Sequence, residues 1–176
     1  MHPKRRRKNS MRLQGWNYKA AGYYFLTFCT HQRKCLFTAE AVVTYLEKTW
    51  LKLPTWKGMH HFHIDEFVIM PNHIHALLWI MKSEVRHDSQ KSNKVEPGSA
   101  SAAVGAFKST ASLKLKNQFR FDPDGKIWQR GFYDRIIRNE RELNATREYI
   151  RLNPVRWVED RDNWGELISR MTYHLE

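Results

Sequence analysis

Two strand-like segments joined by a short turn constrain the fold of this chain more than any other feature. Residues 60–70 (HHFHIDEFVIM) and 73–80 (HIHALLWI) are rich in β-branched and aromatic side chains, which favour extended strands. Pro71 and Asn72 stand between them, and both residue types favour turns. The two segments therefore predict a β-hairpin.

Hydrophobic periodicity and turn residues predict the other elements. A strand is predicted for residues 23–30, and a helix for the segment that follows an N-cap at Thr38 and stops before Pro54. Residues 82–105 are dominated by Ser, Lys, Pro and Gly and show no hydrophobic period. We expect a flexible insertion there.

Three more elements follow the insertion. A helix is predicted around residues 106–119 and a strand at 127–138. Asn139, with Glu142 three residues later, then caps a last helix that ends at Pro154. The resulting β-α-β-β-α-β-α order predicts an α+β fold, a ferredoxin-like antiparallel sheet with helices packed on one face.

The chain is long enough for one domain with a hydrophobic core. It has 176 residues, of which 41% are hydrophobic, and this suits a single globular unit. We expect residues 1–20 to form a basic N-terminal arm and residues 21–157 to form the folded domain that carries the insertion. Residues 158–176 would be a C-terminal tail.

The charge of the chain indicates a polyanionic partner. The chain has 30 Lys and Arg against 18 Asp and Glu, a net charge of +12 at pH 7. Nucleic acid is the first candidate, because neutralising phosphates releases their counterions. An anionic membrane is the rival, but no strongly amphipathic basic helix favours it. No segment is apolar enough to span a membrane and the N-terminus lacks a signal peptide, so we expect a soluble, intracellular protein with no membrane partner.

His73 and His75 are the best candidates for a metal site. Alternate residues of a strand share a face, so both imidazoles would lie on one side and Ile74 on the other. Two such rings can bind one divalent ion. The alternative is a pair of half-exposed sheet histidines, and for the neighbouring His61 and His63 we favour that simpler interpretation.

Tyr149 and Asn153 form a second candidate pair. They are four residues apart in the last predicted helix and would share one face, although Pro154 disfavours helical geometry at Asn153. Tyrosine is a poor nucleophile at its free pKa of ~10, so it needs a metal or a basic group nearby. Taken alone, Tyr149 also suits an ordinary packing role.

Four separated segments resemble one protein family. VIMPNHIHALLW resembles the HUH motif of the single-tyrosine transposases, and REYIRLNPVRW resembles the tyrosine-helix motif of the REP-associated tyrosine transposases. RLQGWNYKAAGYYFLTFCTHQR and WQRGFYDRIIRNERELN are similar to the first-strand and fourth-strand segments of that family. The similarity runs in order through most of residues 4–157, and the insertion at 82–105 and the tail depart from it.

The resemblance implies a metal-dependent single-stranded DNA endonuclease and transposase that cleaves and rejoins DNA through a covalent 5′-phosphotyrosine. It makes Tyr149 the nucleophile, and His73, His75 and Asn153 the ligands of a divalent ion, Mg²⁺ or Mn²⁺. Asn153 stands where related insertion-sequence transposases carry a longer glutamine. The implied partner is single-stranded DNA with hairpin-forming repetitive palindromes. The implied enzyme is bacterial, cytoplasmic, nucleoid-associated when bound to DNA, and a monomer or homodimer.

Basic side chains are candidates for DNA contacts, because such contacts are spread over many residues. The candidates are Arg5, Arg6, Arg7 and Arg12 on the arm, and Lys108, Arg130 and Arg151 nearer the site. The sequence leaves two other functions open: a non-catalytic nucleic-acid-binding protein, or a metal nuclease that activates water. It also leaves open whether the enzyme moves its own gene or processes chromosomal repeats.

Overall fold

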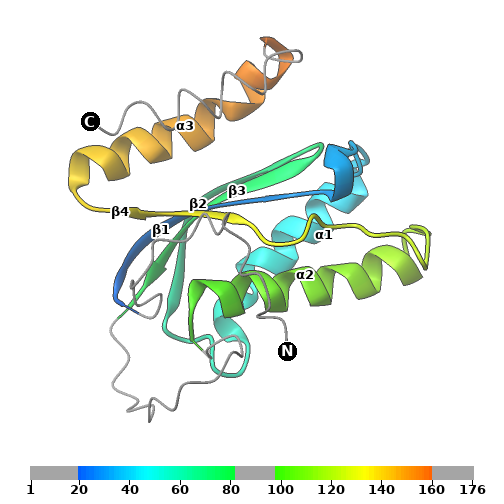
Figure 1. The fold of residues 1–176 in the computed structure, drawn as a ribbon, viewed down its shortest axis with the longest axis horizontal. Helices are drawn as coiled ribbons and strands as arrows, with labels where there is room; N and C mark the ends of the chain where they lie inside the picture. The colour runs from blue at the N-terminus through cyan, green and yellow to red at the C-terminus, as the bar shows by residue number, and fades with distance from the viewer. Residues whose placement is uncertain (1–19, 82–97, 160–176) are drawn as a thin grey trace, which may run out of the picture.

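A four-stranded antiparallel sheet forms the centre of the protein (Figure 1). The computed structural model describes residues 20–81 and 98–159. The strands are β1 Gly22–Cys29, β2 Phe62–Met70, β3 His73–Ile80 and β4 Tyr133–Ile137. The helices are α1 Glu40–Leu51, α2 Ala100–Asn117 and α3 Glu140–Glu159, with short 3-10 turns η1 at His31–Arg33 and η2 at Leu53–Thr55.

The strands lie in the order β2-β3-β1-β4, and each pairs antiparallel with its neighbours. The predicted α+β class and the antiparallel sheet are confirmed. The hairpin is confirmed as well, because β2 and β3 pair around the turn at Pro71 and Asn72.

The main core lies between the sheet and helices α1 and α2. Alternation along β1 puts Tyr24, Leu26 and Phe28 on this face, where all three are buried. Trp50 of α1 and Phe107 of α2 pack against Phe28, with ring centroids 5.7 and 5.6 Å away. This core fixes the positions of the strands, including the residues that they present on the opposite face.

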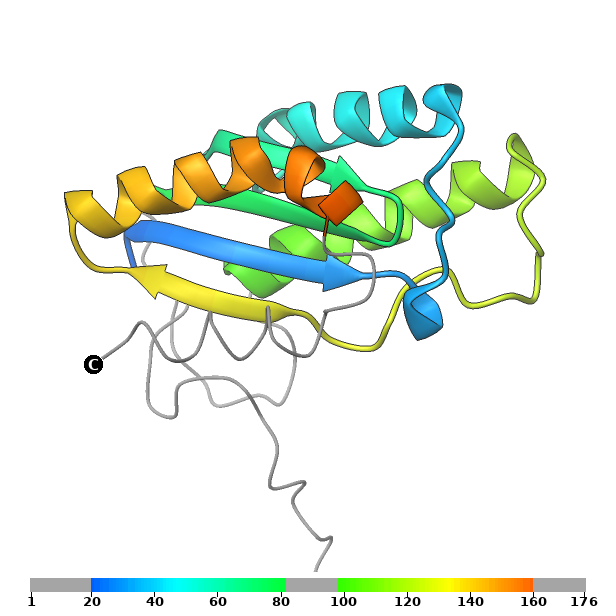
Figure 2. The same cartoon turned by 90° about the horizontal axis from the view of Figure 1, so that it is seen from above.

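The third helix lies on that opposite face. Figures 1 and 2 show α3 on one side of the sheet and α1 and α2 on the other. Helices α1 and α2 therefore pack together on one face, as predicted. Phe25 of β1, Leu77 of β3 and Ile150 of α3 form a second, smaller apolar cluster. Phe25 and Leu77 therefore give the second face of the sheet an apolar centre, and this explains why α3 packs there.

The predicted insertion is wrong for residues 100–105, which form the first turns of α2. Ser99 caps this helix, since its side-chain oxygen accepts a hydrogen bond from the backbone N–H of Ala102 at 3.2 Å. Ala103 and Val104 are buried against the core. The Ala- and Ser-rich segment gives a weak hydrophobic period, but alanine is the strongest helix former. Residues 82–97, the rest of the predicted insertion, lie outside the described residues.

The prediction that the last helix ends at Pro154 is wrong, because α3 continues to Glu159. A proline inside a helix removes one backbone hydrogen bond. The helical turn after Pro154 packs on the histidine pair, because the centroid of the Trp157 ring lies 5.7 Å from that of the His73 ring. The cap at Asn139 is confirmed, since its side chain accepts a hydrogen bond from the N–H of Glu142 at 2.8 Å.

Two smaller boundaries also differ from prediction. The N-cap of α1 is Ala39 and not Thr38, and no side chain caps this helix. The fourth strand begins only at Tyr133, and within residues 127–132 Trp128 forms an isolated bridge with Thr30. In the part of the chain that the structure describes, no helix is long and apolar enough to cross a membrane.

Candidate active site

His73 and His75 lie at the beginning of β3, on the sheet face that α3 covers. As predicted, they share a face while Ile74 points into the main core. Each histidine is only 1% exposed, and their ring centroids are 4.5 Å apart. The alternative of two half-exposed sheet histidines is wrong, because both rings are buried.

Tyr149 reaches the histidine pair from α3. Its hydroxyl oxygen lies 3.3 Å from Nε2 of His75. Its ring is edge-on to the rings of His75 and Phe25, with centroids 5.2 and 5.9 Å away. The next residue, Ile150, is buried in the small apolar cluster and fixes this turn of the helix over the sheet. The tyrosine therefore contacts a histidine of its own chain.

Asn153 lies one helical turn after Tyr149 and is 5% exposed. Its side chain interacts with the ring of His73. Because α3 continues through Pro154, Tyr149 and Asn153 do share the face of the helix that looks toward the histidines. The structure thus brings together the four residues that the sequence singled out for chemistry.

Burial keeps both histidines neutral. Burial, aided by the positive charge of Arg33, lowers the pKa of His73 to about 3, while the Asn153 side chain acts in the opposite direction. Burial and the neighbouring His73 lower the pKa of His75 well below its ordinary value. A neutral imidazole keeps the nitrogen lone pair that a metal ion requires.

Two polar side chains that the sequence analysis missed hold the histidine rings. Thr27 is the direct cross-strand neighbour of His75, and its hydroxyl oxygen lies 2.7 Å from Nδ1 of that ring. Nδ1 of His73 lies 2.8 Å from the side-chain oxygen of Asn72. The position of Asn72 directly before His73 was a usable signal. Nothing in the sequence marks Thr27, since its contact depends on the register of β1 against β3.

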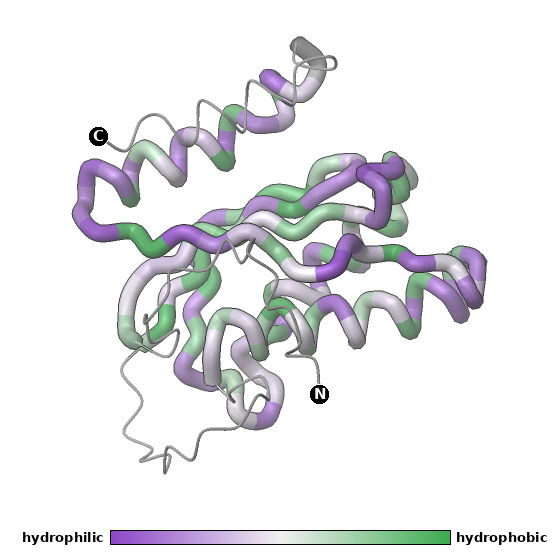
Figure 3. The backbone as a smooth tube through the Cα atoms, viewed as in Figure 1, coloured by the Kyte–Doolittle hydropathy of each residue, from purple (hydrophilic) through white to green (hydrophobic). Residues whose placement is uncertain are grey.

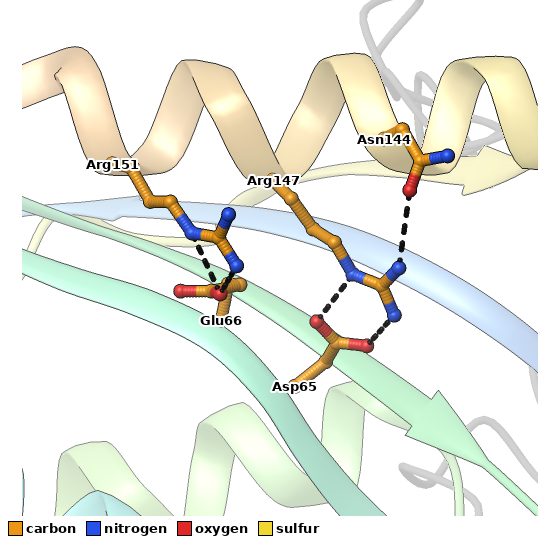
Figure 4. A network of polar contacts seen from close by, with 5 residues as sticks. All are labelled: Asp65, Glu66, Asn144, Arg147 and Arg151. Carbon is orange, nitrogen blue, oxygen red and sulfur yellow. Dashed lines mark hydrogen bonds and ion pairs between the residues drawn. The ribbon is translucent and has the colours of Figure 1, made fainter.

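A bulge in β2 ties the tyrosine helix to the sheet. The pairing of β2 with β3 shifts between Ile64 and Phe67, which leaves one extra residue in β2. Asp65 and Glu66 in this bulge both meet arginines of α3 (Figure 4). Asp65, Glu66 and Arg147 were not predicted as site residues, because a bulge has no clear sequence signal. Arg151 was predicted as a DNA contact, and the structure pairs it with Glu66.

The two ion pairs differ in burial. Nε and Nη2 of Arg147 donate to the two carboxylate oxygens of Asp65 at 2.9 and 2.5 Å, and Asp65 is 11% exposed. Arg147 also donates to the side-chain oxygen of Asn144 at 3.2 Å. Arg151 pairs with Glu66, but the arginine side chain is 64% exposed. Figure 3 shows that α3 is largely hydrophilic. The helix therefore makes few apolar contacts with the sheet, and these ion pairs supplement them.

The predicted DNA contacts are not gathered at the histidine pair. Lys108 donates to the backbone oxygens of Gln129 and Gly131 at 3.1 and 2.7 Å and lies over the rings of Phe28 and Trp128, on the main-core side of the sheet. Burial lowers the pKa of Lys108 to about 8.

The other predicted contacts are more exposed or undescribed. Arg130 is exposed, and Arg151 holds Glu66. The arm residues lie outside the described residues; they are Arg5, Arg6, Arg7 and Arg12. The neighbouring histidines are apart from the site: the His61 ring bonds the Gly98 oxygen at 3.0 Å, and His63 is exposed beside Trp79.

The donor set suits a divalent ion. Two neutral imidazoles and one amide oxygen are ligands that Mn²⁺ accepts, whereas Mg²⁺ prefers oxygen ligands. Within residues 20–81 and 98–159, no three His, Cys, Asp or Glu side chains gather into a metal-binding group. Asn153 would therefore be needed to complete a set of three protein ligands.

Comparisons with other proteins agree with this fold. No protein-family model matches the sequence. The structure is similar to that of a REP-associated tyrosine transposase bound to a REP hairpin, with a TM-score of 0.58 and 20% identity over 82% of this chain and 74% of that chain. An identity this low shows a shared fold and no more.

A relative from Haemophilus influenzae (strain ATCC 51907 / DSM 11121 / KW20 / Rd) is closer in sequence. It is described as an uncharacterized protein, and it is 32% identical over 170 residues, which cover 87% of this chain and 91% of the relative. An alignment of this identity over nearly the full length of both chains indicates common descent. The chain belongs to the same family as this Haemophilus influenzae protein.

Proposed function

We propose that the protein is a metal-dependent, single-stranded DNA endonuclease and transposase that cleaves and rejoins DNA through a covalent bond to Tyr149. The observation that carries this proposal is the 3.3 Å contact between the Tyr149 hydroxyl and Nε2 of His75, in a buried site that also contains His73 and Asn153. The similarity in fold to a REP-associated tyrosine transposase supports it.

The reaction would be a transesterification. The hydroxyl oxygen of Tyr149 gives up its proton and forms a bond to the scissile phosphorus, and the bond from phosphorus to the 3′ oxygen breaks. The 3′ oxygen takes up a proton and leaves as a 3′-hydroxyl, and the 5′ phosphate stays on Tyr149. Because the phosphodiester is conserved, another 3′-hydroxyl can reverse the step and rejoin DNA without a nucleotide cofactor.

His73, His75 and Asn153 would hold the divalent ion, Mn²⁺ or Mg²⁺. When bound, the ion would neutralise charge on a non-bridging phosphate oxygen. The protein's own contribution is positional. Packing of the half-buried Tyr149 ring against the cluster of Phe25 and Ile150 holds it in one place. The neutral histidines do not repel the metal.

The proposed substrate is single-stranded DNA next to a hairpin-forming repeat, met in the bacterial cytoplasm. The net charge of +12 supplies affinity for any polyanion. Arg130 and the basic arm are the proposed phosphate contacts, since Lys108 and Arg151 already have partners within the protein. Because Tyr149 contacts its own histidine, a monomer has all the proposed catalytic groups.

A denaturing gel tests the proposed chemistry. Labelled single-stranded oligonucleotides with hairpin repeats from the source genome would be incubated with Mn²⁺ or Mg²⁺ and each protein variant. We expect a metal-dependent band of DNA linked to protein, absent in Tyr149→Phe. Tyr133→Phe is the matched control, because it removes the same atom from a neighbouring ring on the same face of the sheet.

Two other results would contradict the proposal. Cleavage without a linked band, unchanged in Tyr149→Phe, would indicate a nuclease that activates water. Binding of the oligonucleotides without cleavage, equal in wild type and Tyr149→Phe, would indicate a non-catalytic DNA-binding protein.

A further inference from the structure

The Nδ1 atoms of both site histidines are engaged by side chains of their own chain. Asn72 contacts His73 at 2.8 Å and Thr27 contacts His75 at 2.7 Å. Asn72 is 6% exposed. Such contacts decide which ring nitrogen carries the proton in a neutral imidazole and so which nitrogen can bind a ligand.

The Asn72 contact has a definite direction. The side-chain nitrogen of Asn72 donates to the backbone oxygen of Arg33 at 3.2 Å, so the amide turns its oxygen toward His73. An amide oxygen only accepts hydrogen bonds, and therefore Nδ1 of His73 carries the proton. Nε2 of that ring then carries no proton, and the Asn153 side chain interacts with the same ring.

The Thr27 contact is adaptable. A hydroxyl can donate or accept, so Thr27 accommodates His75 with the proton on either nitrogen. When Nδ1 is protonated, Thr27 accepts and Nε2 has a lone pair directed at the Tyr149 hydroxyl. With its proton on Nδ1, His75 presents the same unprotonated nitrogen, Nε2, as His73.

We infer that Asn72 and Thr27 are positioning residues that fix the two imidazoles with both Nε2 atoms available to one divalent ion. The inference rests on the proposed metal dependence of the enzyme. Asn72 sets the tautomer of His73, and its hydrogen bond to the Arg33 carbonyl keeps the side-chain amide from flipping. Thr27 holds the ring plane of His75, and its hydroxyl oxygen accepts a hydrogen bond from the Nδ1–H of that ring when the ion binds.

The backbone around Asn72 is anchored independently of its side chain. The backbone N–H of Thr30 donates to the backbone oxygen of Asn72 at 2.9 Å. A substitution at Asn72 therefore removes the contact to His73 and leaves the turn tied to the end of β1. This makes the side-chain role separable from folding.

Mn²⁺ affinity measured without DNA tests the inference. Metal-free protein would be titrated with Mn²⁺, and the free ion followed by electron paramagnetic resonance. We expect Asn72→Ala and Thr27→Val each to weaken Mn²⁺ binding about 10- to 100-fold. Asn72→Asp and Thr27→Ser keep an oxygen in place and should restore affinity to within a few-fold. Thr49→Val is the matched control, because Thr49 is a buried threonine of α1 whose hydroxyl donates to the backbone oxygen of Tyr45 in the same helix.

Nitrogen-15 NMR of the histidine rings provides a readout that a general loss of structure would not give. We expect His73 in the wild type to show a proton on Nδ1, and Asn72→Ala to shift the ring toward the other tautomer. Wild-type Mn²⁺ affinity in both Asn72→Ala and Thr27→Val, or an equal loss in Thr49→Val, would overturn the inference.

The inference and the proposed function fail in different ways. If the wild type forms the DNA adduct while the two variants keep full Mn²⁺ affinity, the positioning role is refuted and the tyrosine chemistry stands. If the wild type forms no adduct but the variants lose Mn²⁺ affinity and change tautomer, the positioning role is supported and the proposed reaction is not.

Discussion

Replacing Tyr149 with phenylalanine should strengthen the binding of a divalent ion. The Tyr149 hydroxyl lies 3.3 Å from Nε2 of His75, and Nδ1 of the same ring is already held by Thr27. Nε2 is therefore the nitrogen left for the ion, and the hydroxyl must give up its contact before the ion can take the lone pair. Phenylalanine keeps the ring that packs on Phe25 but removes this competition.

The size of the effect follows from one neutral hydrogen bond. Such a bond contributes about 0.5–1.5 kcal/mol net, and about 1.4 kcal/mol corresponds to a tenfold change in an equilibrium constant. The dissociation constant for Mn²⁺ should therefore fall roughly two- to tenfold in Tyr149→Phe, measured without DNA by the same Mn²⁺ titration. Tyr133→Phe should leave it unchanged, because among the described residues the Tyr133 hydroxyl bonds to neither histidine.

Either of two results would refute this reasoning. Weaker Mn²⁺ binding in Tyr149→Phe would mean that the phenol oxygen is itself a ligand. Unchanged binding would mean that the hydrogen bond to His75 does not hold the ring nitrogen in solution.

Three further predictions concern stability and ligands. The free energy of unfolding should be highest above about pH 6.5 and fall toward pH 3, because the unfolded chain protonates His73 and His75 while the folded protein keeps them neutral. The fall should be at most about 1.4 kcal/mol per pH unit for each histidine. In urea unfolding, the free energy of His75→Gln should depend less steeply on pH than that of the wild type, and an equal dependence would contradict the prediction. Arg147→Gln should lower the free energy of unfolding by about 1–3 kcal/mol, since the mostly buried carboxylate of Asp65 loses its partner; a change below about 0.5 kcal/mol would class the pair with ordinary surface ion pairs. Asn153→Ala should weaken Mn²⁺ binding by about tenfold or more if its amide is a ligand, and an unchanged titration would remove it from the ligand set.

The hairpin and the histidine face were predictable because they depend on local alternation. His73 and His75 lie in a strand in which every alternate residue from Ile74 to Ile80 is apolar, so that set predicts the core face and the histidines fall on the other face. The spacing of Tyr149 and Asn153 was predictable for the same reason, because a helix places residues four apart on one face.

Contacts that depend on register or on tertiary packing were not predictable. Thr27 meets His75 only because β1 pairs with β3 in one particular register, and Asp65 and Glu66 both meet α3 only because β2 contains a bulge. Local rules also failed at Pro154, where a proline that normally ends a helix lies inside α3. In each case a long-range contact decides the outcome.

The attachment of α3 follows from these same contacts and determines how the site is assembled. The helix carries Tyr149, yet it rests on the sheet through a small cluster around Phe25 and Leu77, far smaller than the core beneath α1 and α2. Elements with few buried apolar contacts open at lower free energy than the core. The ion pair of Arg147 with Asp65, on the side of α3 that faces β2, therefore has a larger share in holding this helix than a similar pair would have elsewhere. A loss of that pair should separate Tyr149 from His75 at conditions where the four-stranded sheet and its main core remain folded.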